Sequence, residues 1–113
     1  MKEYIMITTT FSNQEEMEDV VHLLLDERLV SCCQIKKIQS LYHWKGKVEN
    51  EKEYLVLMKT KKDLYKEVEK EILNHHSYEV PEIISYDITN GYSKYLNWIE
   101  DETKSIWLLT HYS

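Results

Sequence analysis

The chain has 113 residues, with 14 basic against 20 acidic side chains and a formal charge of -6. This length fits one hydrophobic core, so residues 1–113 are expected to form a single domain. The negative charge disfavours nucleic acid and anionic membrane surfaces as partners. The longest apolar run, Tyr54 to Met58, is far shorter than the ~20 residues that span a membrane. The N-terminal residues lack the apolar segment of an export signal, which predicts a cytoplasmic location.

The first predicted elements are a strand and a helix. Residues 4–10 mix β-branched and aromatic side chains, which is typical of a strand. Ser12 and Glu15 have the spacing of a capping box, in which the Ser12 hydroxyl accepts a hydrogen bond from the amide of Glu15. Apolar residues then recur at helical spacing as far as Leu25, so a helix is expected to begin at this box.

Residues 31–60 predict a long hairpin. The apolar positions between 31 and 44 keep neither a helical period nor strict alternation, which indicates a strand with a bend or bulge. Lys45-Gly46-Lys47 predicts the turn, and a further strand is expected over 51–60.

The second half of the chain predicts a helix, a strand and a shorter helix. Apolar residues stand four apart within 61–74, and Pro81 prevents continuation of that helix. Residues 82–89 are typical of a fourth strand, and a short third helix is expected around residues 95–99. The segment Ile106-Trp107-Leu108-Leu109 predicts an additional edge strand.

The order strand, helix, strand, strand, helix, strand indicates an α+β, ferredoxin-like split β-α-β sandwich, an antiparallel sheet with helices on one face. The predicted strands are nevertheless apolar on both faces, because Ile5 and Ile7 alternate with Tyr4 and Met6. A bare apolar sheet face is an association surface. The sequence therefore predicts a symmetric homo-oligomer.

The two cysteines, Cys32 and Cys33, are adjacent, which disfavours a disulfide between them. Two thiolates could bind a soft metal ion, although metal sites space their cysteines more widely. We interpret the pair as small core residues at the start of a strand.

Three fragments gather tyrosine, tryptophan, glutamate, lysine and histidine near one turn and two strand ends. They are residues 40–49, residues 53–60 and residues 75–82. Together with the later glycine and aromatic residues they give the pattern Tyr42-x-Trp44-x-Gly46, Glu49, Glu53, Lys59-Thr60, His75-His76-x-Tyr78-x-x-Pro81-Glu82, Gly91 and Tyr95-x-x-Trp98. Over nearly the whole chain this pattern resembles the CutA divalent-cation tolerance proteins.

The resemblance implies a ferredoxin-like homotrimer, related in architecture to the PII signal proteins, with a pocket between neighbouring subunits. It also implies a link to copper and other divalent metal ions, no organic cofactor and no established reaction. The protein itself is then the expected partner, together with a divalent metal or a small molecule.

The resemblance also suggests metal ligands. The copper ligands proposed in bacterial relatives are a cysteine at the end of the first strand and two adjacent histidines, which match His75 and His76 here. Thr8 stands at the cysteine position, so the softest ligand is missing. The alternative is that a histidine here caps the last helical carbonyls and interacts with the helix dipole.

The aromatic and charged residues have two compatible interpretations. Tyr42 and Trp44 share one face of a strand, and an interior Lys59 would require a carboxylate such as that of Glu82. These residues either form a hydrogen-bonded seam between subunits or line a pocket for a small ligand. The complete set is Tyr42, Trp44, Glu53, Lys59, Tyr78 and Glu82.

The sequence thus favours a non-enzymatic, CutA-like homotrimer that responds to metal ions and binds copper or another divalent ion. Catalysis is disfavoured because nothing fixes a nucleophile against a base or two carboxylates at a set separation. The alternative function is a small-molecule sensor or interaction scaffold with a ligand pocket between subunits.

Overall fold

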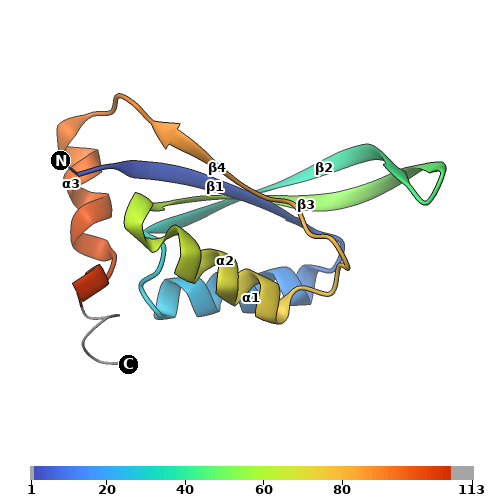
Figure 1. The fold of residues 1–113 in the computed structure, drawn as a ribbon, viewed down its shortest axis with the longest axis horizontal. Coiled ribbons are helices and arrows are strands. Elements are labelled where there is room, and N and C mark those ends of the chain that lie inside the picture. The colour runs from blue at the N-terminus through green and yellow to red at the C-terminus, as the bar shows by residue number, and fades with distance from the viewer. Residues whose placement is uncertain (1, 108–113) are drawn as a thin grey trace.

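The computed structural model describes residues 2–107 and has the predicted order of elements. They are β1 (Tyr4–Phe11), α1 (Gln14–Asp26), β2 (Cys32–Trp44), β3 (Lys47–Lys61), a 3-10 turn (Lys62–Leu64), α2 (Tyr65–His75), β4 (Ile83–Ile88) and α3 (Ser93–Glu102). The strands form one antiparallel sheet in the order β2-β3-β1-β4. Helices α1 and α2 lie together on one face of it (Figure 1). The α+β, ferredoxin-like prediction is confirmed.

The hydrophobic core lies between this face of the sheet and the two helices. Alternate residues of β1 and β3 point into it, as expected from the two-residue period of a strand. The helices contribute residues at three- and four-residue spacing. The fully buried members include Ile5, Ile7, Phe11, Val20, Leu24, Val56, Met58, Leu64, Val68 and Ile72.

The first helix begins one residue later than the predicted capping box requires. Asn13 is the N-cap, and its side-chain oxygen accepts from the N–H of Glu16 at 2.9 Å. The Ser12 and Glu15 box is therefore wrong. Asparagine and serine are about equally good caps, so the sequence alone does not decide between neighbouring candidates.

The β2–β3 hairpin is long and regular. Its pairing runs without interruption from Cys32 opposite Lys59 to Trp44 opposite Lys47, so the predicted bulge in β2 is wrong. The irregular apolar pattern of residues 31–44 has another cause. Beyond the pair Phe11–Tyr54 the hairpin extends past the end of β1, so its side chains there do not pack in the core and need not alternate. In Figure 1 this two-stranded ribbon projects from the body of the protein.

The hairpin turn depends on one glycine. Lys45 and Gly46 have φ values of 50° and 81°, as the two central residues of a tight type I′ turn require. Gly46→Ala should lower the free energy of unfolding by about 1 kcal/mol because alanine is strained at positive φ. Lys45→Gly is the matched control at the other residue with positive φ, and it should leave the free energy of unfolding unchanged or raise it. Urea denaturation at fixed protein concentration measures both, and equal losses from the two variants would contradict this account of the turn.

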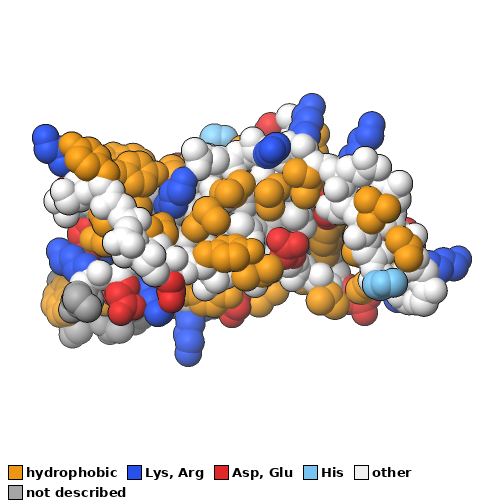
Figure 2. Space-filling model, turned by 90° about the horizontal axis from the view of Figure 1, so that it is seen from above, with side chains coloured by type: hydrophobic (Ala, Val, Ile, Leu, Met, Phe, Trp, Pro, Cys, Tyr) orange, Lys and Arg blue, Asp and Glu red, His pale blue; other side chains and the backbone are white. Residues whose placement is uncertain are grey.

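The opposite face of the sheet is not covered by α1 or α2. Figure 2, which views this face, shows apolar side chains gathered over its middle. Ile84 is 43% exposed and Tyr86 50% exposed, and Met6, Leu55 and Leu57 beside them are half-buried. We call this set the apolar strip.

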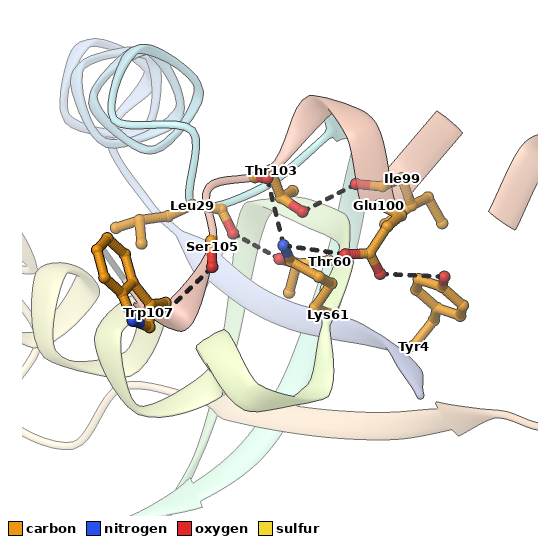
Figure 3. A network of polar contacts seen from close by, with 9 residues as sticks. All are labelled: Tyr4, Leu29, Thr60, Lys61, Ile99, Glu100, Thr103, Ser105 and Trp107. Atoms are coloured by element: carbon orange, nitrogen blue, oxygen red, sulfur yellow. Dashed lines mark hydrogen bonds and ion pairs between the residues drawn. The ribbon is translucent and has the colours of Figure 1, made fainter. Parts of the chain in front are cut away.

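Helix α3 packs at the end of the sheet where β1 begins and β3 ends. Figure 3 shows the Lys61 side chain between Glu100 and Thr103. Its Nζ lies 3.4 Å from a Glu100 carboxylate oxygen and donates to the Thr103 carbonyl at 3.3 Å. The Tyr4 hydroxyl donates to the same carboxylate at 3.2 Å. These bonds fasten α3 to the two central strands.

The structure describes only the first two residues of the edge strand predicted after α3, and for these two the prediction is wrong. Ile106 and Trp107 are not in the sheet, while Leu108 and Leu109 lie outside the described residues. Within residues 2–107, no helix is both long and apolar enough to cross a membrane.

Candidate functional site

A groove of about 920 Å³ opens at the hairpin end of the sheet. Five carboxylates line it, from Glu49, Glu51, Glu53, Glu79 and Glu82. The rings of Tyr42, Trp44 and Tyr78 also line it, as does the imidazole of His43. We call this the acidic groove. Its negative charge and aromatic walls suit a cationic group.

The innermost contact of the groove joins Glu53 and Tyr78. Glu53 is only 6% exposed, and it accepts a hydrogen bond of 2.6 Å from the Tyr78 hydroxyl. Burial, and next this bond to Glu53, raise the pKa of Tyr78 well above its usual range. Tyr78 is therefore protonated at neutral pH and serves as a donor to the buried carboxylate.

Tyr78 is held in place by His76. The Tyr78 N–H donates to Nδ1 of His76 at 3.1 Å, so Nε2 carries the ring proton and donates to the Thr10 carbonyl at 2.7 Å. The ring also stacks on Phe11 with 4.4 Å between centroids, and its side chain is 0% exposed. The carbonyl that His76 binds belongs to β1, so His76 joins the end of α2 to the sheet.

His75 has different surroundings. Its side chain is 51% exposed, and Nε2 lies 3.7 Å from a carboxylate oxygen of Glu71, one helical turn earlier. It borders a second hollow of about 730 Å³ together with three acidic residues of α1, Glu15, Glu16 and Asp19. Residues 2–107 contain no group of three or more histidine, cysteine, aspartate or glutamate side chains placed to hold a metal ion. Metal ligation by His75 and His76 stays a prediction.

Thr8, at the position of the expected cysteine, belongs to neither hollow. Its hydroxyl donates to a Glu82 carboxylate oxygen at 3.5 Å, which links β1 to the start of β4. Thr8 is 6% exposed, and Ile84 lies opposite it in the sheet.

Tyr42 and Trp44 stand on the projecting part of the hairpin. Tyr42 lies opposite Glu49, and burial followed by a hydrogen bond with Glu51 raises the pKa of its hydroxyl. Lys45 places its ammonium 5.6 Å from the centre of the Trp44 ring, within the range of a cation–π contact. The Trp44 ring, which lines the groove, therefore already contacts one cation of the same chain, the Lys45 ammonium.

The expected contact between Lys59 and Glu82 is wrong. Lys59 lies opposite Cys32 and Met6, at the α3 end of the sheet, whereas Glu82 precedes β4 at the groove end. Lys59 instead donates to the side-chain oxygen of Gln34. The register across the central strand β1 separates the two residues, and strand order alone does not reveal that register.

Five of the predicted site residues therefore line one groove, and three lie elsewhere. Those in the groove are Tyr42, Trp44, Glu53, Tyr78 and Glu82, and those outside it are Lys59, His75 and His76. The sequence prediction missed Glu51 and Glu79. The signal for Glu51 was the alternation of glutamate at positions 49, 51 and 53, which places three carboxylates on one face of a strand.

The two cysteines are free and face opposite sides of the sheet. Cys33 packs against the core, and Cys32 lies 3.7 Å from the Tyr95 hydroxyl at the edge of α3. Burial, followed by the neighbouring Cys32, raises the pKa of Cys33 to about 12.

Cys33 is therefore expected to resist alkylation in the folded protein. The raised pKa keeps Cys33 in the thiol form at pH 8, whereas the thiolate is the reactive form. A Cys32→Ser variant has Cys33 as its only cysteine, and mass spectrometry after iodoacetamide treatment measures the modification. We expect modification in urea and none in buffer, and equal rates in both would show that Cys33 is accessible.

The fold and the groove together define a class of protein: a small ferredoxin-like domain with one bare apolar sheet face and a carboxylate-rich groove at the end of that face. The model of the CutA1 divalent ion tolerance protein family matches residues 5–102 of the chain. The chain belongs to this family.

Individual relatives align with this chain over most of their length. The divalent-cation tolerance protein CutA of Pyrococcus horikoshii is 40% identical over 100 residues, covering 88% of this chain and 98% of the relative. The Thermotoga maritima protein of the same description is 33% identical, covering 86% of this chain and 96% of its own. The crystal structure of CutA1 from Pyrococcus horikoshii has a TM-score of 0.86 at 39% identity, covering 89% of this chain and 99% of that one.

Proposed function

We propose that this protein is a non-enzymatic homotrimer that acts in the response to divalent metal ions and binds copper or a similar ion weakly. Membership of the CutA1 divalent ion tolerance family is the observation that carries the proposal. The carboxylate-rich groove and the formal charge of -6 support attraction of cations.

The apolar strip supports the trimer. Ile84 and Tyr86 leave about half of their surface in water in the single chain, and a second copy would bury it. Sedimentation equilibrium should give three times the chain mass of 13.7 kDa. A stable species of 13.7 kDa at micromolar concentration would rule out this part of the proposal.

The chemistry of the groove supports a non-enzymatic role. A general acid or base works best with a pKa close to the operating pH. Burial and Glu53 move the pKa of Tyr78 further from neutrality, which suits a structural donor. Glu53, its acceptor, is buried beneath this bond.

His75 supports the metal clause better than His76 does. A neutral imidazole is a good ligand for copper, zinc and nickel, and His75 is exposed with a carboxylate 3.7 Å away. His76 would have to break two hydrogen bonds to bind an ion. One imidazole and one carboxylate make an incomplete ligand set, so weak binding is expected.

Isothermal titration tests the metal clause. Cu(II), Zn(II) and Ni(II) should be titrated into the wild-type protein and into His75→Ala, with His22→Ala as the control because His22 is an exposed histidine of α1. We expect heat from at least one ion, its loss in His75→Ala and its retention in His22→Ala. No heat from any of the three ions would refute metal binding.

The second candidate function is a small-molecule sensor or interaction scaffold whose ligand lies between subunits. The aromatic lining of the acidic groove, with Tyr42, Trp44 and Tyr78, favours it. Thermal-shift screening with a metabolite library should then find a compound that stabilises the wild type but not Trp44→Ala. A compound that stabilises both variants equally would bind elsewhere.

A further inference from the structure

Three carboxylates of the acidic groove form a row along one strand. Glu49, Glu51 and Glu53 are alternate residues of β3, so their side chains point to the same face of the hairpin. A strand rises about 3.3 Å per residue, which places neighbouring members of this carboxylate row about 6.6 Å apart. Glu79 and Glu82 line the groove from the segment before β4. Charges spread in this way suit a ligand with several separated cationic groups.

Aromatic rings stand beside the carboxylate row on the neighbouring strand. Tyr42 lies directly opposite Glu49 in the hairpin. Trp44, two residues further along β2, points to the same face. The face of an aromatic ring attracts a cation, and the methylene groups between the charges of an organic cation can pack against it. The aromatic wall therefore favours an organic cation over a hydrated metal ion.

A buried hydroxyl without a hydrogen bond also lines the groove. Thr10 of β1 is 4% exposed and lies opposite Leu55, two residues from Glu53 on β3. The Thr10 carbonyl accepts from His76, but its hydroxyl has no hydrogen-bond partner within residues 2–107. A buried polar group that stays unpaired is destabilising, so such a group normally has a partner. An N–H group of a ligand in the groove would provide one.

The groove also has spare acceptor capacity and an excess of negative charge. Tyr78 donates to one oxygen of Glu53, and a carboxylate can accept further hydrogen bonds. Lys36 and Lys47 share the face of the carboxylate row, and Lys45 lies in the hairpin turn. The five groove carboxylates exceed these nearby ammonium groups in number. A ligand with two or more positive charges would offset the excess.

We propose that the acidic groove binds a linear aliphatic polyamine, a chain of protonated amines joined by short methylene segments. The nitrogens of an extended diaminobutane unit lie roughly 6 Å apart, which is close to the spacing of the carboxylate row. Successive amines donate to successive carboxylates, while the methylene groups pack on Tyr42 and Trp44. The amine at the floor of the groove donates to Glu53 and to the Thr10 hydroxyl. This inference rests on the small-molecule function given above as the second candidate, and it names the chemical class of the ligand.

Isothermal titration with spermidine tests the proposal. About 0.1 M NaCl should be present, because it screens exposed charges beyond about 10 Å. E49Q/E51Q removes two charges of the row and should weaken binding by about tenfold or more. Thr10→Val keeps the branched shape but removes the hydroxyl, and it should weaken binding by about threefold or more. The control E18Q/D26N gives the same change of net charge at exposed positions of α1, on the other side of the sheet, and should bind as the wild type does.

A ligand series on the wild-type protein provides a second test that depends on no variant. Spermidine should bind more tightly than diaminobutane, and diaminobutane more tightly than butylamine, because each added amine meets a further carboxylate. Mg²⁺ has the same charge as diaminobutane but no methylene groups to pack on the rings. It should therefore displace spermidine less effectively than diaminobutane does.

The proposal is overturned if spermidine gives no heat, or if folded E49Q/E51Q binds it as tightly as the wild type does. Circular dichroism verifies the folding of each variant. Equal weakening in E18Q/D26N, or equal displacement by Mg²⁺ and diaminobutane, would also overturn it, since either result indicates general attraction of charge. The second candidate function fails separately. A library compound that depends on Trp44, without any binding of spermidine, refutes the polyamine and leaves the small-molecule function standing, whereas the lack of any such compound refutes both.

Discussion

His76→Ala is expected to lower the free energy of unfolding by about 3 kcal/mol. The substitution removes a buried ring stacked on Phe11 and leaves the N–H of Tyr78 and the carbonyl of Thr10 without their partner. The loss should also loosen the segment that carries Tyr78 into the groove. Urea denaturation at fixed protein concentration measures the change.

His75→Ala is the matched control, because the neighbouring imidazole is 51% exposed. Its free energy of unfolding should stay within about 0.5 kcal/mol of the wild type. The two variants should therefore separate stability from metal binding. His76→Ala lowers the stability of the fold, and His75→Ala lowers the affinity for the metal ion. Similar stabilities for both variants would show that the His76 contacts contribute little.

Lys61→Ala should also be destabilising, by about 2 kcal/mol, because it leaves the partly buried carboxylate of Glu100 without its ammonium partner. The Lys61 side chain is 9% exposed and that of Glu100 is 24% exposed. Without the ammonium, the Glu100 carboxylate keeps the hydrogen bond from the Tyr4 hydroxyl, and the Thr103 carbonyl loses the Lys61 donor (Figure 3). The anchoring of α3 to the sheet should weaken, which hydrogen exchange of the α3 amides would detect.

Lys62→Ala provides the comparison for Lys61. Lys62 is 52% exposed and forms ion pairs with Glu3 and Asp87 at the surface. Exposed pairs contribute at most about 1 kcal/mol, so this variant should be close to the wild type in urea denaturation. If Lys61→Ala proved no more destabilising than Lys62→Ala, the Lys61–Glu100 pair would not be what fastens α3.

The core and the order of elements were predictable because they follow from local periodicity. Leu64, Val68 and Ile72 recur every four residues and are all fully buried in the structure. Gly46 marked the hairpin turn for the same local reason, its tolerance of positive φ. The family resemblance was predictable from the spacing of aromatic, glycine and charged residues, and the family match confirms it.

What depends on register could not be predicted. Lys59 and Glu82 appeared to be neighbours from the order of the strands, yet the pairing of β1 with β3 and β4 places them at different ends of the face. Likewise, nothing local distinguishes His75 from His76. Only the position of Phe11 and Thr10 beside the end of α2 decides which imidazole is buried.

The groove itself was predictable in part. Tyr42, Trp44 and Glu53 were identified through the family pattern, and all three line it. Its strong acidity was not foreseen, because the carboxylates come from the hairpin and from the segment before β4, which meet only in the folded chain.

A crystal structure of the protein soaked with Cu(II), with anomalous diffraction recorded at the copper edge, tests the central claim most directly. The account predicts three copies around a threefold axis, with the acidic groove of each copy at a subunit boundary. It also predicts an anomalous copper peak within bonding distance of a His75 nitrogen. A structure with isolated chains, or one with no anomalous peak near His75 at saturating copper, would contradict it.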